Sequence, residues 1–279
     1  MRFCSFRFDG AARFGVVDGD GIVDLTGRVA YPDLAAAIVA NDLVGLERAA
    51  SGVGVDIALS DVIFLPTIPA PSKVVCIGLN YEPHRIEMGR EKDPYPTVFV
   101  RLNDTLVGHG CPLTKPRNSD AFDFEGEVAL VIGKAGRHIA EADAMDYVVG
   151  YTCFMDASVR DFQSQNLIAG KNFPATGGMG PWLVPASAMP PAHEIALETR
   201  LNGARMQEGR LDELTYSIPE IIAYISSWTD LRPGDVISTG TPSGVGTARK
   251  PPIYMKPGDL IEVSVTGIGV LRHAVVAEV

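Results

Sequence analysis

The feature that most constrains the fold is a pair of glutamates that runs directly into an apolar segment. Glu125 and Glu127 flank Gly126, and the apolar residues 128–132 (Val-Ala-Leu-Val-Ile) follow before Gly133. A run rich in β-branched residues that ends at glycine is typical of a buried strand. On a strand, residues two apart point to the same face, about 7 Å apart along the chain. Two like charges on one buried face are costly unless a cation lies between them.

A third carboxylate follows the next apolar run. Asp156 comes directly after residues 148–155. Neighbouring strands lie about 4.8 Å apart, so Asp156 can meet Glu125 and Glu127 at one ion. Three carboxylates with no nearby His or Cys suit Mg²⁺ or Mn²⁺, or Ca²⁺, rather than Zn²⁺. The spacing alone fits equally well two solvent-facing glutamates on an edge strand and an aspartate that caps a helix.

Further motifs in the same order resemble those of the fumarylacetoacetate hydrolase superfamily, over about residues 70–279. They are Gly-Leu-Asn-Tyr at 78–81 with His84 and Glu87, Glu125-x-Glu127, Gly150-Tyr151, Asp156 with Arg160-Asp161, Gly-Lys-Asn-Phe at 170–173, Gly-Pro-Trp at 180–182, Asn202-Gly203, and residues 233–246. So many motifs in one order exceed what a short chance match gives. The resemblance implies that Glu125, Glu127 and Asp156 hold a divalent metal.

The resemblance also implies three catalytic residues. His84 and Glu87 lie three apart on a short predicted helix and share a face. The family carries such a pair near its metal, where the carboxylate orients the imidazole and favours its protonated form. Lys171 stands where the family has an active-site lysine that stabilises developing negative charge. On the pattern alone, a solvated helix and a solvated loop lysine are the simpler interpretation.

Three substrate-binding residues follow from the same resemblance. Arg101 replaces the family's usual lysine near the substrate carboxylate, and its planar fork can bind a carboxylate at two points. Gln163 stands about where the family has a substrate-contacting amide, although a solvent-facing helix residue fits nearly as well. Thr241 belongs to a Gly-Thr-Pro loop that receives the substrate carboxylate in the family, a task suited to a nest of backbone and hydroxyl donors. Pro174 departs from the Asp, Ser or Thr common in relatives, which puts any finer assignment of substrate in doubt.

The chain divides into two predicted domains. Residues 1–65 predict a small N-terminal α/β domain, with a hairpin turn at 18–21 and one amphipathic helix over 32–49. Residues 66–72 are proline-rich and predict an extended linker. Residues 73–279 hold many short strands, few helices and frequent Gly and Pro turns, which predict a β-rich α+β fold. The resemblance implies a mixed β-sheet roll there, and a homodimer.

The segments that follow the third carboxylate are predicted as a helix and a loop. Residues 158–166 are predicted to be helical, with Ser158 as the N-cap. Residues 170–182 are rich in glycine and show no period, which predicts an irregular segment. A later helix is predicted over residues 218–228, opened by the capping box Ser-Ile-Pro-Glu.

Composition and charge exclude several classes of function. The net charge of −10 argues against nucleic acid and anionic membranes as partners, because both require basic patches. No apolar stretch approaches the length of a membrane span, and the N-terminus lacks the pattern of a signal peptide. The four cysteines have no metal or redox spacing, which favours a reducing, cytoplasmic location. An anionic substrate is repelled at long range, so its site needs a metal and local Lys or Arg.

Together these features predict a divalent-metal-dependent hydrolase that cleaves a C–C bond in a 2,4-dioxo acid, resembling acylpyruvate or fumarylacetoacetate, and releases pyruvate or a related acid. The metal acts as a Lewis acid on this small anionic 2-oxo acid, His84 activates water, and Lys171 stabilises the oxyanion. The same site also suits an isomerase, tautomerase or decarboxylase of a 2-oxo or 2-hydroxymuconate-type acid. An inactive metal-binding oligomer is the non-enzymatic alternative.

Overall fold

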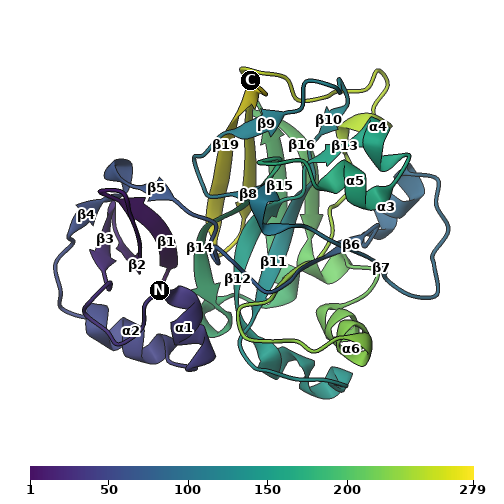
Figure 1. Cartoon of the computed structure of the whole chain (residues 1–279). Helices are drawn as coiled ribbons and strands as arrows, with labels where there is room; N and C mark the ends of the chain where they lie inside the picture. Colours follow the sequence, from purple (N-terminus) through teal and green to yellow (C-terminus); the bar gives the residue numbers. More distant parts are fainter.

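The N-terminal part of the chain forms a small sheet covered by two helices, at the left of Figure 1, in a computed structural model that describes residues 1–279. Its elements are β1 (Phe3–Phe8), β2 (Ala11–Asp18), β3 (Gly21–Asp24), α1 (Leu34–Val39), α2 (Leu43–Ala50), β4 (Ile57–Ala58) and β5 (Ile63–Phe64). The single helix predicted over 32–49 is wrong. Asn41 has a φ of +54°, which ends α1, and the Asp42 carboxylate caps α2 by accepting from the Gly45 N–H.

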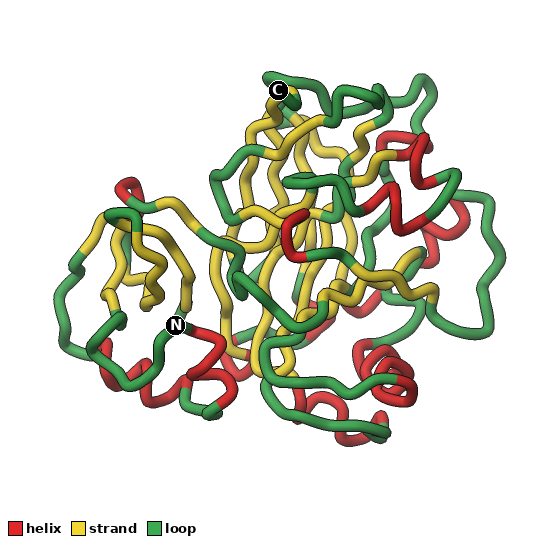
Figure 2. Tube along the Cα trace, viewed as in Figure 1, coloured by secondary structure: helices red, strands yellow, loops and turns green.

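The rest of the chain holds the larger, strand-rich part (Figure 2). Its strands are β6 (Val74–Gly78), β7 (Thr97–Val100), β8 (Leu106–Val107), β9 (Leu113–Lys115), β10 (Phe122–Asp123), β11 (Gly126–Ile132), β12 (Val148–Met155), β13 (Ser158–Val159), β14 (Gly177–Pro185), β15 (Ala196–Leu201), β16 (Ala204–Arg210), β17 (Val236–Ser238), β18 (Leu260–Val265) and β19 (Gly269–Ala277). Its α-helices are α3 (Glu82–Glu87), α4 (Arg160–Gln163), α5 (Leu167–Lys171) and α6 (Ile218–Trp228). Short 3₁₀ turns span Leu59–Asp61, Asn103–Thr105, Glu141–Tyr147, Ala186–Ala188, Ala192–Glu194, Leu211–Glu213 and Gly246–Ala248.

Two sheets enclose the main core, and the fold is the expected β-rich α+β type. The larger sheet has the strand order β4-β3-β2-β1-β14-β12-β11-β17-β6-β7, and the smaller one β16-β15-β18-β19-β9. Strand β11 is buried along its whole length, because its two faces serve two clusters. Val128, Leu130 and Ile132 pack in the cluster that includes the smaller sheet, whereas Ala129 and Val131 pack in the cluster shared with the N-terminal part. A strand buried on both faces explains the unbroken apolar run in the sequence.

The N-terminal part is joined to the rest through β1 and the predicted linker. Strand β1 pairs with β14, so the larger sheet runs through both parts of the chain. Residues 66–72 form no helix or strand. They are nevertheless packed, because Ile68 is buried in the shared cluster and the Thr67 hydroxyl lies 3.0 Å from that of Thr152. The first half of this segment is therefore packed against the core, while Pro69, Ala70 and Ser72 are exposed.

Two local predictions near the third carboxylate are wrong. Residues 158–166 do not form one helix: Ser158 lies in β13, which pairs with β10, and α4 begins at Arg160. Residues 170–182 are not irregular throughout, since Lys171 ends α5 and β14 starts at Gly177. The glycines of β14 permit close packing: a Cβ on Gly178 would lie 2.1 Å from the His273 ring. The helix predicted over 218–228 and its capping box are confirmed in α6.

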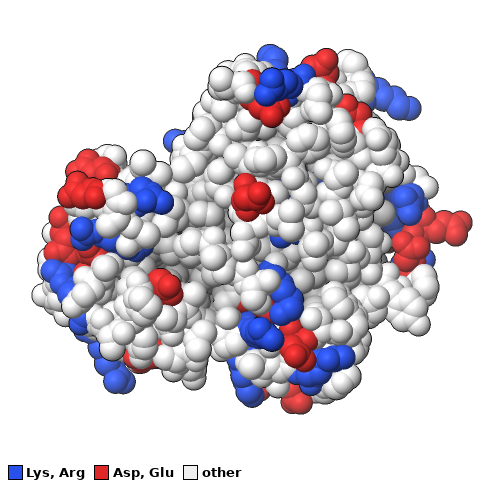
Figure 3. Space-filling view, in the orientation of Figure 1, with Lys and Arg blue, Asp and Glu red and all other residues white.

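The surface and the helices add two observations. On the face drawn in Figure 3, basic and acidic side chains are interspersed and form no continuous basic area. None of the helices is both long and apolar enough to cross a membrane.

Candidate metal centre and active site

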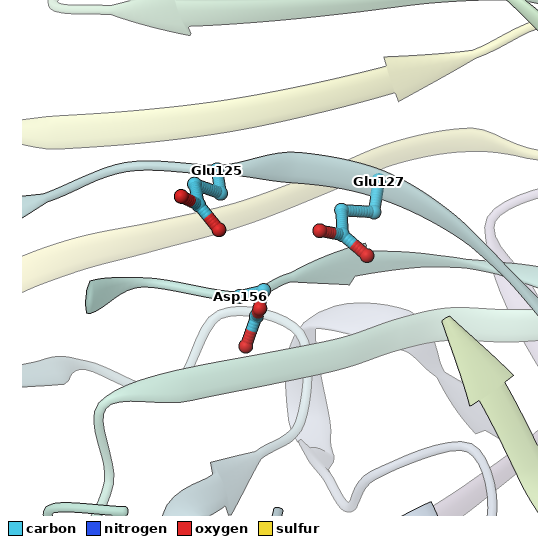
Figure 4. Close-up of side chains that lie close together, drawn as sticks. All are labelled: Glu125, Glu127 and Asp156. Atoms are coloured by element: carbon cyan, nitrogen blue, oxygen red, sulfur yellow. The ribbon is translucent and has the colours of Figure 1, made fainter. Parts of the chain in front are cut away.

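The three predicted carboxylates converge where β11 begins and β12 ends. Gly126 pairs with Met155 in the antiparallel ladder, so the residues on either side, Glu125 and Asp156, lie across from each other. The Asp156 N–H donates to the Glu125 carbonyl at 2.8 Å. One carboxylate oxygen from each of Glu125, Glu127 and Asp156 lies within 4.8 Å of the other two (Figure 4). All three residues are buried, which rules out the solvent-facing alternative for the glutamates.

Two of the carboxylates are each held by an arginine through one oxygen. Arg160 Nη2 lies 2.7 Å from Glu125 Oε1, and Arg101 Nη1 donates to Asp156 Oδ1 at 2.6 Å. Both arginines are charge partners that fix the direction of the carboxylate through one oxygen, while its second oxygen lies on the side of Lys171.

Glu127 is anchored only by neutral donors. Its Oε2 accepts from the Ser238 hydroxyl and from the Gly240 N–H at 3.1 Å. Burial, together with the charges of Asp156 and Glu125, raises the pKa of Glu127 well above its usual range. At Glu125 burial acts in the same direction, but Lys171 and the neighbouring arginine outweigh it and lower the pKa to about 2. No Lys or Arg forms an ion pair with Glu127. The negative charge at this carboxylate is therefore the part of the site that the protein itself does not balance.

Lys171 reaches into the same centre from the end of α5. Its Nζ donates to Glu125 Oε2 at 2.5 Å and to Asp156 Oδ2 at 2.6 Å. Burial acts to lower the pKa of Lys171, yet the two carboxylates outweigh burial and raise it, so the side chain is an ammonium ion. The donor set of three buried carboxylates fits a hard divalent cation such as Mg²⁺, Mn²⁺ or Ca²⁺, with Lys171 as an additional positive charge beside it.

The predicted His–Glu pair forms at one wall of the site. His84 Nδ1 lies 3.1 Å from Glu87 Oε2 on α3. Glu87 is itself fixed, because its two oxygens accept from the Gly244 N–H at 2.9 and 3.1 Å. His84 is only 3% exposed. This geometry gives an oriented imidazole whose other ring nitrogen is free for proton transfer.

A cavity of about 430 Å³ brings most of the predicted residues together. Its lining includes His84, Met88, Arg90, Phe99, Glu125, Glu127, Asp156, Arg160, Gln163, Leu167, Lys171, Thr241 and Thr247. Gln163 Oε1 accepts from Arg160 at 2.7 Å, which leaves its amide nitrogen free. The Thr241 hydroxyl donates to the Gly126 carbonyl at 2.9 Å and lies 2.7 Å from the Gln207 amide nitrogen. Substrate contacts by Gln163 and Thr241 remain predictions.

Arg101 lies elsewhere than predicted. Its side chain is completely buried behind Asp156 and is absent from the cavity lining. Beyond Asp156, its guanidinium donates to the Thr105 hydroxyl at 3.2 Å, the Ala157 carbonyl at 3.1 Å and the Thr176 hydroxyl at 2.8 Å. Direct contact with a substrate carboxylate is therefore the wrong assignment, and the position of Arg101 is that of a residue that orients Asp156.

Sequence reasoning missed two residues that shape the site. Ser238, on β17, donates to Glu127 and had no predicted role at the site. Asp123 accepts from Arg160 at 2.8 Å and from the Gly246 and Thr247 N–H groups at 2.7 and 2.9 Å, which ties the loop after β17 to the metal ligands. A strand that brings a hydroxyl to a buried glutamate leaves no periodic signal. For Asp123, its place two residues before Glu125 was the available signal.

Comparison with known proteins decides the family. Residues 73–276 match the family described as Fumarylacetoacetate (FAA) hydrolase C-terminal. The chain belongs to this family. It is 41% identical over 224 residues to oxaloacetate tautomerase YisK of Bacillus subtilis (strain 168), which covers 78% of this chain and 74% of the relative.

Two solved structures of the FAA hydrolase family resemble the whole chain, each covering 100% of both chains. One is a 5-carboxymethyl-2-hydroxymuconate delta-isomerase from Mycobacterium smegmatis, with 31% identity and a TM-score of 0.78. The other is maleylpyruvate hydrolase from Sphingobium sp. SYK-6 in complex with manganese(II) ion and pyruvate, with 29% identity and a TM-score of 0.84. The family thus includes a tautomerase, an isomerase and a hydrolase. Membership supports an enzyme with a divalent metal, while the type of reaction differs among these relatives.

Proposed function

We propose that this protein is a divalent-metal-dependent tautomerase that interconverts the enol and keto forms of a small 2-oxo acid. The observation that carries this proposal is that His84, oriented by Glu87, lines the same cavity as the three carboxylates and Lys171. Keto–enol exchange needs one proton moved at the carbon beside the 2-oxo group and negative charge stabilised on the oxygen. A base and a positive centre within one small cavity supply these two requirements.

Each residue has a defined task in this scheme. Glu125, Glu127 and Asp156 hold the metal, which when bound supplies Lewis-acid polarisation of the 2-oxo group. His84 moves the proton, and Glu87 stabilises the imidazolium that forms when the ring is protonated. The Lys171 ammonium, held between two carboxylates, stabilises negative charge that develops on the substrate oxygen. The identity of 41% to an oxaloacetate tautomerase supports this reaction ahead of the others.

The second candidate is the hydrolase of a 2,4-dioxo acid. It is favoured by the same His84–Glu87 pair, because an oriented imidazole can equally take a proton from water that attacks a distal carbonyl. The likeness to maleylpyruvate hydrolase supports it as well. A decarboxylase could use the same metal and Lys171 to stabilise the enolate that forms when CO₂ leaves.

The products separate these reactions. Protein reconstituted with Mg²⁺, then with Mn²⁺, is given enol-oxaloacetate, and the enol absorbance, pyruvate and CO₂ are followed, with EDTA and protein-free buffer as controls. A tautomerase removes the enol absorbance faster than buffer without releasing pyruvate or CO₂. Pyruvate with CO₂ from oxaloacetate indicates a decarboxylase, and pyruvate from a short acylpyruvate indicates the hydrolase. If no substrate shows a metal-dependent change, the remaining alternative is that the protein is an inactive metal-binding oligomer.

A further inference from the structure

Arg90 is a cation in the cavity that the proposed chemistry does not use. It follows α3, lines the same cavity as the metal ligands, and is exposed. Its guanidinium makes no hydrogen bond or ion pair within the protein. The other two long cations of the lining, Arg160 and Lys171, are both engaged with carboxylates. Arg90 is therefore the cation of this cavity that remains available to a ligand.

The backbone of Arg90 is fixed by the turn that ends α3. Gly89 has a φ of +64°, the left-handed conformation that closes helices. The Arg90 N–H donates to the Arg85 carbonyl at 3.1 Å, and the Arg85 guanidinium donates back to the Arg90 carbonyl. Only the side chain of Arg90 is left free, and it follows the helix that carries His84.

None of the nearby carboxylates forms an ion pair with Arg90. Glu91 and Asp93 are the nearest in sequence, and Asp93 accepts from the Thr97 hydroxyl at 3.4 Å. Glu82 forms its ion pair with Arg85, and Glu87 is occupied by His84 and the Gly244 N–H. An unpaired guanidinium at the wall of a small cavity is well suited to a carboxylate, which it binds at two points.

We propose that Arg90 binds a second carboxylate of the substrate, so that the site prefers 2-oxo dicarboxylates to 2-oxo monocarboxylates. This inference rests on the proposed function and names the substrate class for it. The first carboxylate and the 2-oxo group lie at the metal end, beside Lys171, and the distal carboxylate lies at the α3 wall. A cavity of about 430 Å³ is of the size for such a small diacid.

The test compares two non-reacting acids that differ chiefly by the distal carboxylate. Titration calorimetry of the Mn²⁺-loaded protein gives the Kd of L-malate and of L-lactate for the wild type, Arg90→Gln and Arg90→Lys. The wild type is expected to bind malate more tightly than lactate. Arg90→Gln should weaken malate binding by about 10- to 100-fold and leave lactate within about twofold, since one charged hydrogen-bonding group is lost. Arg90→Lys should recover part of the difference.

A matched control separates direct contact from the general field. Lys92→Gln removes the same charge two residues away, where the ammonium lies 4.9 Å from the Tyr216 ring centroid and outside the cavity lining. It should leave both Kd values unchanged. The inference is overturned if Arg90→Gln weakens malate and lactate equally, if it weakens neither, or if Lys92→Gln has the same effect. Because binding is measured without turnover, failure of the proposed tautomerase reaction would appear separately, as wild-type protein that binds malate but does not remove enol-oxaloacetate.

Discussion

The floor of the cavity and its α3 wall are held in different ways. At the floor, Glu125, Glu127 and Asp156 are buried at the ends of strands inside the larger sheet, and each has one oxygen anchored by a protein donor. At the wall, residues 82–90 form one short helix and a turn whose side-chain bonds are mostly internal, with Glu87 reaching the Gly244 N–H. Few attachments and high exposure mark regions of low local stability. The metal ligands are thus fixed by the sheet, while the base is carried on the less strongly attached element.

The net charge of the floor depends on whether a metal is bound. The floor buries four carboxylates against three cations, so with every carboxylate ionised, as metal binding requires, it carries one net negative charge without the metal. A divalent ion changes this to one net positive charge, which attracts an anionic substrate although the whole chain has a net charge of −10. The residues counted are Asp123, Glu125, Glu127 and Asp156 against Arg101, Arg160 and Lys171.

The largest effect is expected at the floor, from Glu127→Gln. This variant should lose Mn²⁺ binding measured by calorimetry and lower metal-dependent turnover on the order of 1,000-fold or more, because one of three ligands is removed. Since burial and its acidic neighbours disfavour the charge of Glu127, the thermal midpoint in EDTA should stay the same or rise. Glu82→Gln, on exposed α3, is the control. Full Mn²⁺-stimulated activity in Glu127→Gln would show that the metal lies elsewhere.

At the wall, His84→Gln should separate chemistry from metal binding. We expect kcat to fall by about 10²- to 10⁴-fold, the usual contribution of a general acid–base group, while the Kd of Mn²⁺ changes by no more than about twofold. Steady-state kinetics and calorimetry on the same preparation give both numbers. A large loss of metal affinity, or an unchanged kcat, would contradict the division between floor and wall.

The floor could be predicted from a periodic signal combined with the family resemblance, because the spacing alone fits solvent-facing glutamates equally well. Two glutamates at a spacing of two, followed by an apolar run, place both side chains on one face of a strand. The next apolar run then brings Asp156 beside them in the adjacent strand. For His84 and Glu87 the helical spacing of three predicts only a shared face, and their place beside the metal ligands follows from the resemblance.

The remaining features depend on contacts between distant segments, which have no period. Arg101 turns behind Asp156 because Gly177, 76 residues later, leaves room for it: a Cβ there would lie 2.8 Å from the guanidinium. The break between α1 and α2 depends on the left-handed backbone of Asn41, inside a stretch whose apolar spacing suits one helix. The role predicted for Arg101 came from the resemblance and was overridden by packing, whereas the predicted single helix was broken by the backbone conformation of one residue.

Arg101→Met tests whether the anchoring of the floor matters. We expect the Kd of Mn²⁺ to rise by about 10- to 100-fold, as is usual when a group that orients a metal ligand is lost. Gly177→Ala leaves every charge in place but displaces the guanidinium, so a change in the same direction is expected. Thermal midpoints with and without Mn²⁺ distinguish weaker binding from general unfolding. If both variants bind Mn²⁺ like the wild type, Arg101 only fills the core.

The smallest effect is expected from Ser238→Ala, which removes one of the two donors to Glu127 Oε2. The Gly240 N–H remains at 3.1 Å, so the carboxylate keeps its direction and the Kd of Mn²⁺ should rise only about 3- to 10-fold. Ser226→Ala is the matched control, because that buried hydroxyl donates to the Ala223 carbonyl in α6, away from the site. It should lower the thermal midpoint without changing the Kd. An effect of Ser238→Ala as large as that of Arg101→Met would mean that neutral donors fix the floor as strongly as charged ones.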